Sequence, residues 1–301
     1  MTGQPGPGLS PGGAGRAEAG SSAPRIPGLQ RALDEMPGRF AAWGRAPVEA
    51  AFYGGTFTAL PDGWPLRFLR ALHPLRQRGL VTAARCSTRP DALSPEQLAV
   101  LAGAGLDTVE LGVQTFDEAA LTAARRGHGA GASSRACALV RGAGLGLGLQ
   151  LLPGLPGHTP RSFAEDIAQC LELRPDFVRI HPCLVLRGTG LEGLWRQGAY
   201  VPWDVPETLE ALGEAVLALW RGGIAVARVG LAPEASMLSA VLAGPWHPAM
   251  GARVRARALW REIRARLDGR TAVSLSLPQR YSGEFWGHAG EMEPRYRVLG
   301  L

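Results

Sequence analysis

The sequence predicts an α/β fold built around a parallel sheet. Apolar runs of strand length alternate with stretches of helical periodicity between about residues 28 and 231. The runs are almost continuously apolar, which is typical of buried parallel strands. The connections are short, so each helix can serve as the crossover between two parallel strands. Periodicity alone does not distinguish an open sheet from a closed or partial barrel.

Six strands and seven helices are expected in this region, in strict alternation for most of its length. The strands are predicted at residues 48–57, 80–86, 108–113, 145–152, 177–186 and 224–231. The helices are predicted at residues 28–43, 65–78, from 94 onward, 117–125, 133–141, 160–173 and 206–221. Apolar residues three or four apart mark the helices, and Ser94 with Gln97 forms a capping box at the start of the third.

Composition divides the chain into three parts. Of its 301 residues, 46% are hydrophobic and 19% are charged, so a sizeable core can form. Residues 1–25 are rich in Gly, Pro, Ala and Ser and are expected to be disordered. Residues 26–232 hold the strand–helix alternation. Residues 233–301 are expected to form a small C-terminal α+β extension, with an arginine-rich helix and a strand near 272–277.

No segment of the sequence predicts a membrane location. No apolar run approaches the roughly 20 residues that a membrane helix needs. The N-terminus lacks the charged start and apolar block of a signal peptide. We therefore expect a cytoplasmic protein without a membrane partner.

The charged residues and the cysteines limit the chemistry. The formal net charge of +6 permits an anionic partner such as nucleic acid, but the densest basic patch, Arg253–Arg266, also fits a solvated helix face, which we favour. The chain has no lysine, which excludes a Schiff-base lysine and a phosphate-loop lysine. The four cysteines lie far apart and form no CxxC or CxxxCxxC motif, so no metal or iron–sulfur site is predicted from them.

Glycines and polar residues gather where strands end, the usual place for a site in an α/β fold. Gly54 and Gly55 follow the first strand, where they permit either a close ligand or a tight turn. Glu110 and Gln114 lie two pleat repeats apart and should share a face, either around a ligand or in an internal hydrogen-bond network. Arg126 can bind a carboxylate or phosphate, or lie on the surface.

Further candidates follow the second and fourth strands. Ser87 and Arg89 belong either to a ligand site or to a polar turn enforced by Pro90. Gly154 and Gly157 permit a turn, or a flat ring lying against the backbone.

Two polar side chains lie inside predicted strands. Gln150 faces either the core or a ligand. His181 is more typical of a satisfied core histidine than of a ligand or a base. No Ser/His/Asp or Cys/His set with recognisable spacing accompanies them.

Taken together, the motifs resemble the radical S-adenosylmethionine superfamily, and within it the branch related to the radical domain of the Elongator catalytic subunit. The matching segments occur in order over about residues 48–249. They are AFYGGTFTALP, STRPDAL, VELGVQTFDEAALTAARRGH, GLQLLPGLPGHT, PDFVRIHPCLVLRGTGL and AGPWHPA. Several ordered motifs make a more specific match than any single glycine pair.

The resemblance implies a partial (βα)6 TIM-like barrel that lacks its first strand, with S-adenosylmethionine at the carboxyl ends of the strands. Gly54, Gly55 and Thr56 match the motif whose backbone holds the amino group of the cofactor. Gln114 and Arg126 match side chains that meet its ribose and carboxylate, and residues 154–157 and 180–183 match the region that packs the adenine. The residues expected around the cofactor are Gly54, Gly55, Thr56, Ser87, Arg89, Glu110, Gln114, Arg126, Gln150, Gly154, Gly157 and His181.

The family's cluster-binding loop is not found in this sequence. Family enzymes carry CxxxCxxC after the first strand, and its thiolates hold a [4Fe–4S] cluster that cleaves S-adenosylmethionine to a 5′-deoxyadenosyl radical. This sequence has no such triad, so no metal ligand is assigned to it. Either the chain is a truncated form of an active enzyme whose full gene product supplies the loop, or it is a degenerate, non-catalytic scaffold that binds a nucleoside ligand or RNA. The retained Glu110, Gln114 and Arg126 favour truncation, and the substrate and oligomeric state stay open.

Overall fold

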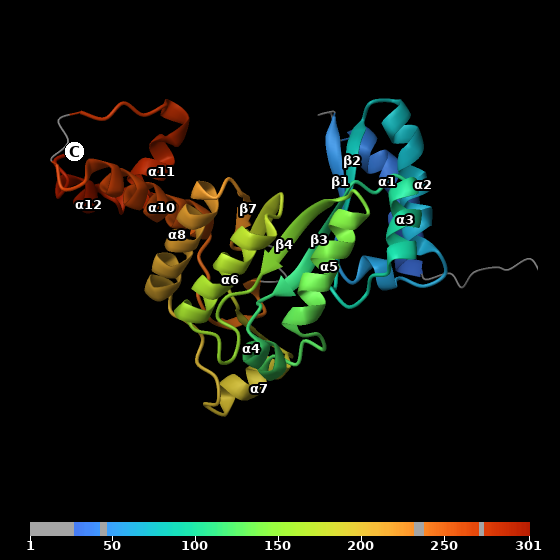
Figure 1. Ribbon diagram of the computed structural model, residues 1–301, viewed down its shortest axis with the longest axis horizontal. Coiled ribbons are helices and arrows are strands. Elements are labelled where there is room, and N and C mark those ends of the chain that lie inside the picture. The colour runs from blue at the N-terminus through green and yellow to red at the C-terminus, as the bar shows by residue number, and fades with distance from the viewer. Residues whose placement is uncertain (1–26, 43–46, 232–237, 271–273) are drawn as a thin grey trace, which may run out of the picture.

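The computed structural model describes residues 27–42, 47–231, 238–270 and 274–301, so the disorder predicted for residues 1–25 lies outside the described residues. Six parallel strands form one curled sheet in the order β1-β2-β3-β4-β5-β7, and helices cover one of its faces (Figure 1). The predicted α/β partial barrel is therefore confirmed. None of the helices in these ranges is both long and apolar enough to cross a membrane.

Strand and helix bounds agree closely with the periodicity for most elements. The strands of the sheet are β1 (Val48–Phe52), β2 (Val81–Thr88), β3 (Thr108–Gln114), β4 (Gly146–Leu151), β5 (Phe177–Ile180) and β7 (Ala225–Val229). The helices around the sheet are α1 (Pro27–Ala42), α2 (Trp64–Gln77), α3 (Pro95–Gly103), α4 (Glu118–Ala123), α5 (Ala130–Gly142), α6 (Pro160–Leu173), α7 (Gly190–Arg196) and α8 (Val205–Arg221). A 3₁₀ turn, η1 (Phe57–Ala59), follows the first strand.

Side-chain caps explain where several helices begin. The Ser94 hydroxyl accepts the Gln97 N–H at 3.2 Å at the start of α3. Thr159 and Ser162 form a reciprocal capping box at the start of α6, where Pro160 occupies the first turn. Such caps satisfy amide groups that have no partner inside the helix.

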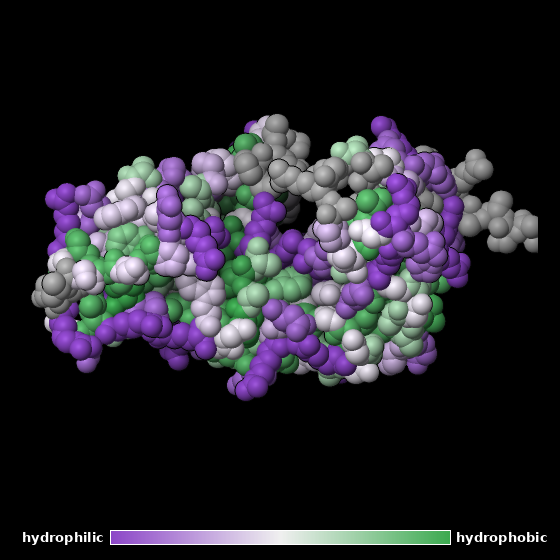
Figure 2. Space-filling model, turned by 90° about the horizontal axis from the view of Figure 1, so that it is seen from above, coloured by the Kyte–Doolittle hydropathy of each residue, from purple (hydrophilic) through white to green (hydrophobic). Residues whose placement is uncertain are grey.

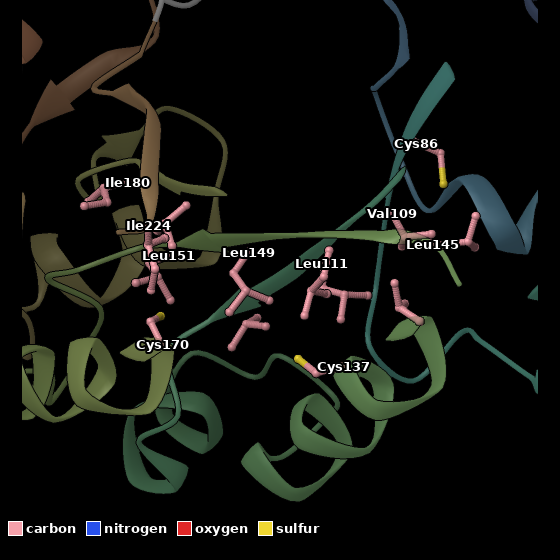
Figure 3. Packing of buried hydrophobic residues seen from close by; sticks show 14 of the residues in the cluster. Cys86, Val109, Leu111, Cys137, Leu145, Leu149, Leu151, Cys170, Ile180 and Ile224 are labelled. Atoms are coloured by element: carbon pink, nitrogen blue, oxygen red, sulfur yellow. The ribbon is translucent and has the colours of Figure 1, made fainter. Parts of the chain in front are cut away.

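The two faces of the sheet differ in chemistry. On the convex face, Leu111, Leu149 and Leu151 point toward the outer helices and pack near Cys137 of α5 and Cys170 of α6 (Figure 3). These side chains are buried and form the main core of the molecule. Burial of this apolar surface is the principal force that holds the helices on the sheet.

The concave face is polar. The parallel register places Glu110 between Ser87 and Gly148. It also places Gln150 beside Arg179. In a closed TIM barrel the interior is filled by branched apolar side chains. Here the same face carries carboxylate, amide and guanidinium groups, so the inside of this half-barrel is suited to a polar ligand.

Two predicted strands are shorter than expected. β1 ends at Phe52 because Gly54 turns the chain at φ 104°, and Phe57 lies in η1 instead. The expected strand at 177–186 is two strands: β5 ends before Pro182, which has no N–H to donate. The second piece, β6 (Val185–Leu186), pairs antiparallel with β8 (Val241–Ala243).

The C-terminal extension is mainly helical. α10 (Met250–Leu267) packs along α8, and it is followed by η2 (Gln279–Tyr281), α11 (Ser282–Trp286), η3 (His288–Gly290) and α12 (Glu293–Arg297). The expected strand near 272–277 is not formed at residues 274–277, and residues 271–273 lie outside the described ranges. A small core of its own holds the extension together, and apolar side chains also show at its surface, at the left of Figure 2.

The arginine-rich helix α10 is only in part the solvated face that we favoured from the sequence: Arg264 and Arg266 are exposed, but three earlier arginines are paired. Arg253 and Arg257 bind the Glu291 carboxylate, with N–O distances of 2.9 and 3.2 Å. Arg257 and Arg261 also pair with Glu210 of α8. The charges of Arg253, Arg257 and Arg261 are thus paired with carboxylates of the same chain.

Acid is expected to weaken the docking of this extension. Burial raises the pKa of Glu291, but hydrogen bonds from Arg253 and Arg257 outweigh it and hold the pKa at about 2. The folded pKa is below the ordinary value, so the stabilisation is present above about pH 4.5 and is lost as the pH falls toward 2. Glu291→Gln should lower the free energy of unfolding by about 1–3 kcal/mol at pH 7 and much less at pH 2.5. Denaturant titrations at both pH values measure the difference, and an equal loss at both would contradict it.

Candidate functional site

A hollow of about 350 Å³ lies at the carboxyl edge of β2, β3 and β4. It is formed by the ends of these strands, the turn after β1 and the segment after α4. Seven of the residues expected from the sequence line it: Gly55, Thr56, Ser87, Arg89, Gln114, Arg126 and Gln150. The fold therefore brings together residues that are far apart in the chain, because parallel strands end at the same edge.

Gln114 has an unusual backbone conformation at the end of β3. Its φ is 72°, a value uncommon for a residue with a side chain, and the pairing with β4 shifts register between Leu111 and Gln114. The Gln114 carbonyl accepts the Leu152 N–H at 2.7 Å, and its side-chain oxygen lies 3.4 Å from the Gln150 amide nitrogen. Such strain costs about 1–3 kcal/mol and is found most often at functional sites.

Gly112 makes room for the Gln114 amide, a role that the sequence did not reveal. A Cβ at Gly112 would lie 2.8 Å from the Gln114 side-chain nitrogen, closer than real Cβ contacts. Both residues line the hollow. The absence of a side chain at position 112 therefore allows the amide to fold back over the strand.

Three arginines line the hollow, Arg89, Arg125 and Arg126, and the first and last of them differ in their partners. Arg89 binds both oxygens of Asp91, at 2.9 and 2.6 Å, which raises its pKa. The buried Nε of Arg126 has no hydrogen-bond partner among the described residues. Burial lowers the pKa of Arg126, and the neighbouring Arg89 lowers it further. A bound anion would supply the missing partner of this guanidinium.

Glu110 lies deeper in the sheet and does not line the hollow. Its side chain is 0% exposed, and its Oε2 accepts the Tyr53 hydroxyl at 3.1 Å and lies 3.3 Å from Arg179 Nε. Burial raises its pKa despite Arg179, and burial also raises the pKa of Tyr53 to about 12. Oε1 has no partner within the described part of the chain. Glu110 therefore belongs to an internal hydrogen-bond network, one of the two alternatives that the sequence analysis gave for this residue.

The remaining expected residues, Gly54, Gly154, Gly157 and His181, lie near the same edge of the sheet but not in the hollow. Gly154 is buried at φ 87° against the Trp203 indole, where a Cβ would be 3.5 Å away. His181 follows β5, and its Nδ1 lies 3.1 Å from the Gly230 carbonyl oxygen and so acts as the donor. Burial lowers the pKa of His181 to about 4, which leaves the imidazole neutral at pH 7.

A second hollow, of about 380 Å³, runs along β1 beneath α1. β1 is an edge strand, and no described strand pairs with its outer side. The lining is mostly apolar, with Arg39 and Glu49 as its charged members. The hollow lacks converging polar groups, so it is not the candidate site, but it shows that the sheet is open on this side.

The cysteines of this chain do not fit a cluster. All four are buried on different elements, and burial raises the pKa of each thiol, to about 12 for Cys86 and about 11 for Cys137. Within the described ranges no group of three or more His, Cys, Asp or Glu side chains could hold a metal ion. A [4Fe–4S] cluster therefore has no ligands among these residues.

Replacing Gly112 with alanine is expected to weaken a ligand that contacts Gln114. The new Cβ would displace the Gln114 amide and lower affinity by roughly three- to tenfold, the value of about one hydrogen bond. The matched control is Gly142→Ala at the end of α5, where a Cβ would meet no atom within 4 Å. Ligand titration by calorimetry compares the two, and equal affinities would remove Gln114 from the site.

Comparisons with known proteins agree with the motifs. The family model described as "Radical SAM superfamily" matches residues 25–170, and the one described as "Radical_SAM C-terminal domain" matches residues 175–259. The chain is 31% identical to the tRNA uridine(34) acetyltransferase of Methanocaldococcus jannaschii over 188 residues, which are 56% of this chain and 35% of that protein. It is 32% identical to Elongator complex protein 3 of Danio rerio over 192 residues, which are 57% and 35%. The matched region thus spans about a third of these relatives.

Solved structures show the same fold. Elp3 of Methanocaldococcus infernus, with an N-terminal deletion, superposes with a TM-score of 0.66 at 23% identity, covering 79% of this chain and 59% of that one. Coproporphyrinogen III oxidase (HemN) of Escherichia coli, a radical SAM enzyme, gives a TM-score of 0.52 at 23% identity, covering 65% and 46%.

The half-barrel and the polar hollow at its carboxyl edge define a radical S-adenosylmethionine domain. The chain belongs to the radical SAM superfamily, and its similarity is to the Elongator protein 3 branch. Members of this family bind S-adenosylmethionine and a [4Fe–4S] cluster. The residues of the hollow suit the first of these groups, and the cysteines of this chain do not suit the second.

Proposed function

We propose that this chain binds S-adenosylmethionine in the hollow at the carboxyl edge of β2–β4. The observation that carries the proposal is the unpaired, buried guanidinium nitrogen of Arg126 in a hollow that is also lined by amides, hydroxyls, glycines and two further arginines. A zwitterionic nucleoside offers a carboxylate for Arg126 and hydroxyls for Gln114 and Gln150. Gly55 also lines the hollow and leaves its backbone accessible to a ligand.

The residues of this chain would bind and orient the cofactor. Arg126 holds the carboxylate by a charge-assisted hydrogen bond, and Gln114 fixes the ribose. Glu110 stays in the internal network with Tyr53 and Arg179, where it sets the shape of the concave face. In this family, S-adenosylmethionine supplies a 5′-deoxyadenosyl radical for attack on the substrate.

Cleavage of S-adenosylmethionine to a radical requires the three cysteine ligands of a [4Fe–4S] cluster, which this sequence does not contain. We therefore propose 5′-deoxyadenosyl-radical chemistry only where additional sequence supplies those ligands. The substrate is unidentified. Because its relatives are named for tRNA uridine modification, tRNA is the first substrate class to test, although the paired arginines of α10 do not favour that surface as its docking site.

Isothermal titration of the chain with S-adenosylmethionine tests the proposal. We expect measurable but weak binding, because no iron is available to chelate the amino and carboxylate groups. Gln114→Ala should lower the affinity about two- to tenfold through the loss of one hydrogen bond. Gln197→Ala, at an exposed position after α7, is the matched control and should have no effect. No binding by the parent chain, or equal affinities in the two variants, would contradict the proposed site.

A further inference from the structure

Three buried polar side chains lie behind the hollow and take no direct part in it. They are Thr115, His158 and Asp166, from the end of β3, the turn after β4 and the middle of α6. The side chains of His158 and Asp166 are 0% and 1% exposed, and Thr115 is fully buried. None of the three lines the hollow, so a role in binding there must act through the backbone that they hold.

One oxygen of Asp166 holds the chain directly after Gln114. Its Oδ1 accepts the Thr115 hydroxyl at 2.9 Å and the Phe116 N–H at 2.7 Å. The Thr115 oxygen in turn accepts the Asp117 N–H at 3.0 Å. These bonds fix the two residues that follow Gln114. A left-handed backbone at a residue with a side chain persists only where its surroundings determine it in this way.

The other oxygen of Asp166 holds the turn that contains Gly154. Its Oδ2 lies 3.1 Å from His158 Nε2, in a short contact that is not well aligned as a hydrogen bond. The same Nε2 lies 3.4 Å from the Thr115 hydroxyl oxygen, which gives Thr115 a contact with this turn as well. The opposite ring nitrogen, Nδ1, accepts the Gly154 N–H at 3.3 Å. Nδ1 is therefore unprotonated, and the hydrogen of a neutral His158 lies on Nε2, facing the carboxylate.

Two aromatic residues close the same turn from the other side. The Trp203 indole stacks on His158 and donates to its carbonyl at 3.1 Å. The Tyr200 hydroxyl donates to the Gly154 carbonyl at 2.6 Å. Both the N–H and the carbonyl of Gly154 are therefore hydrogen-bonded. Through His158, Asp166 connects this turn to the residues that follow Gln114.

We propose that Asp166 and His158 are positioning residues: one buried carboxylate contacts both the Gln114 turn and the group that holds the Gly154 turn. It thereby fixes the distance between Gln114 and the turn that the family resemblance assigns to the adenine. This inference rests on the proposed function for the identity of the ligand. It assigns no contact between either residue and the cofactor.

Isosteric substitutions can distinguish the effect of Asp166 on the Gln114 turn from its effect on the Gly154 turn. In Asp166→Asn, the amide oxygen can still accept from Thr115 and Phe116, but its NH2 group then faces the His158 Nε2–H. Moving that hydrogen to Nδ1 would oppose it to the Gly154 N–H. Asp166→Asn should therefore loosen the Gly154 turn and spare the Gln114 turn. Thr115→Val removes the hydroxyl that donates to Asp166 Oδ1, accepts from Asp117 and lies 3.4 Å from His158 Nε2, so it should loosen the Gln114 turn more than the Gly154 turn.

Hydrogen exchange on the full chain without ligand tests the structural half of the proposal. In Asp166→Asn we expect amides of residues 152–158 to exchange about tenfold faster or more, with residues 113–117 little changed. Thr115→Val should speed exchange at residues 113–117 more than at residues 152–158. Glu165→Gln, the same change at an exposed neighbour on α6, is the control and should affect neither segment. Unchanged exchange in both turns, or the same effect in the control, would overturn the proposal.

Titration with 5′-methylthioadenosine and with S-adenosylmethionine tests the functional half. The first ligand has the nucleoside but not the carboxylate, so Asp166→Asn should weaken both ligands by the same factor, about five- to tenfold. Faster exchange with unchanged affinity would show a merely structural role and overturn the proposal. If the parent chain binds neither ligand, the proposed function fails, while the exchange experiment still decides whether Asp166 connects the two turns.

Discussion

Replacing Arg126 with methionine is expected to lower the affinity for S-adenosylmethionine by about ten- to a hundredfold. The substitution keeps an unbranched side chain of similar length and removes the group that would bind the carboxylate. A hydrogen bond to a charged group is worth about 1.5–3 kcal/mol, and each 1.4 kcal/mol is a factor of ten. The effect should be absent for 5′-methylthioadenosine, which has no carboxylate.

The same substitution should not destabilise the fold. Arg126 Nε is buried without a partner in the described structure, and burial already lowers the pKa of the side chain. Removing an unsatisfied buried cation costs little or is favourable. Arg161→Met, at a residue on α6 whose side chain is 91% exposed, removes the same charge outside the hollow and is the control. An equal loss of affinity in both variants would indicate a general effect of net charge.

The fold could be predicted because the sequence patterns that mark its strands and helices are local and recur along the chain. Apolar runs predicted all six strands of the sheet, and the predicted Ser94 cap lies where α3 begins. The errors have particular causes. Pro182 divides the expected fifth strand, and the left-handed Gly54 ends the first strand early. Both residues are visible in the sequence, but whether a strand stops or bends there depends on pairing partners that lie far away in the chain.

The candidate site could be predicted only in part. Gln114, Arg126 and Gln150 share the hollow because they follow strands that end at one edge. The spacing of Glu110 and Gln114 was expected to place both on one face of a regular strand. Gln114 contacts Gln150 and lines the hollow, whereas Glu110 on the same concave face binds Tyr53 and Arg179 and does not line it.

The network behind the hollow left no pattern in the sequence. Asp166 and Thr115 are separated by 51 residues, and Glu110 and Tyr53 by 57. His158 and Asp166 are closer, but a helix start lies between them, so neither strand nor helix periodicity relates them. Such pairs become recognisable only when the sheet has brought their elements together.

Because the convex face of the sheet carries the apolar core, truncating a side chain on that face should cause the largest loss of stability among the proposed substitutions. Leu149 lies in the middle of β4, beside Leu111 on one neighbouring strand and Val178 on the other, and its side chain is fully buried. Leu149→Ala should lower the free energy of unfolding by about 2–5 kcal/mol, from lost transfer energy and from the cavity left under the outer helices. The cost should fall near the upper end because a strand paired on both sides cannot move into the cavity.

Denaturant unfolding measures this loss, with Leu275→Ala as the matched control. Leu275 is 43% exposed in the C-terminal extension, and its truncation should cost less than about 0.5 kcal/mol. A loss below about 1 kcal/mol for Leu149→Ala would mean that the convex face is not the main core. Because Leu149 and the hollow lie on opposite faces of the same strands, the folded variant should bind S-adenosylmethionine as the parent chain does, which separates stability from site geometry.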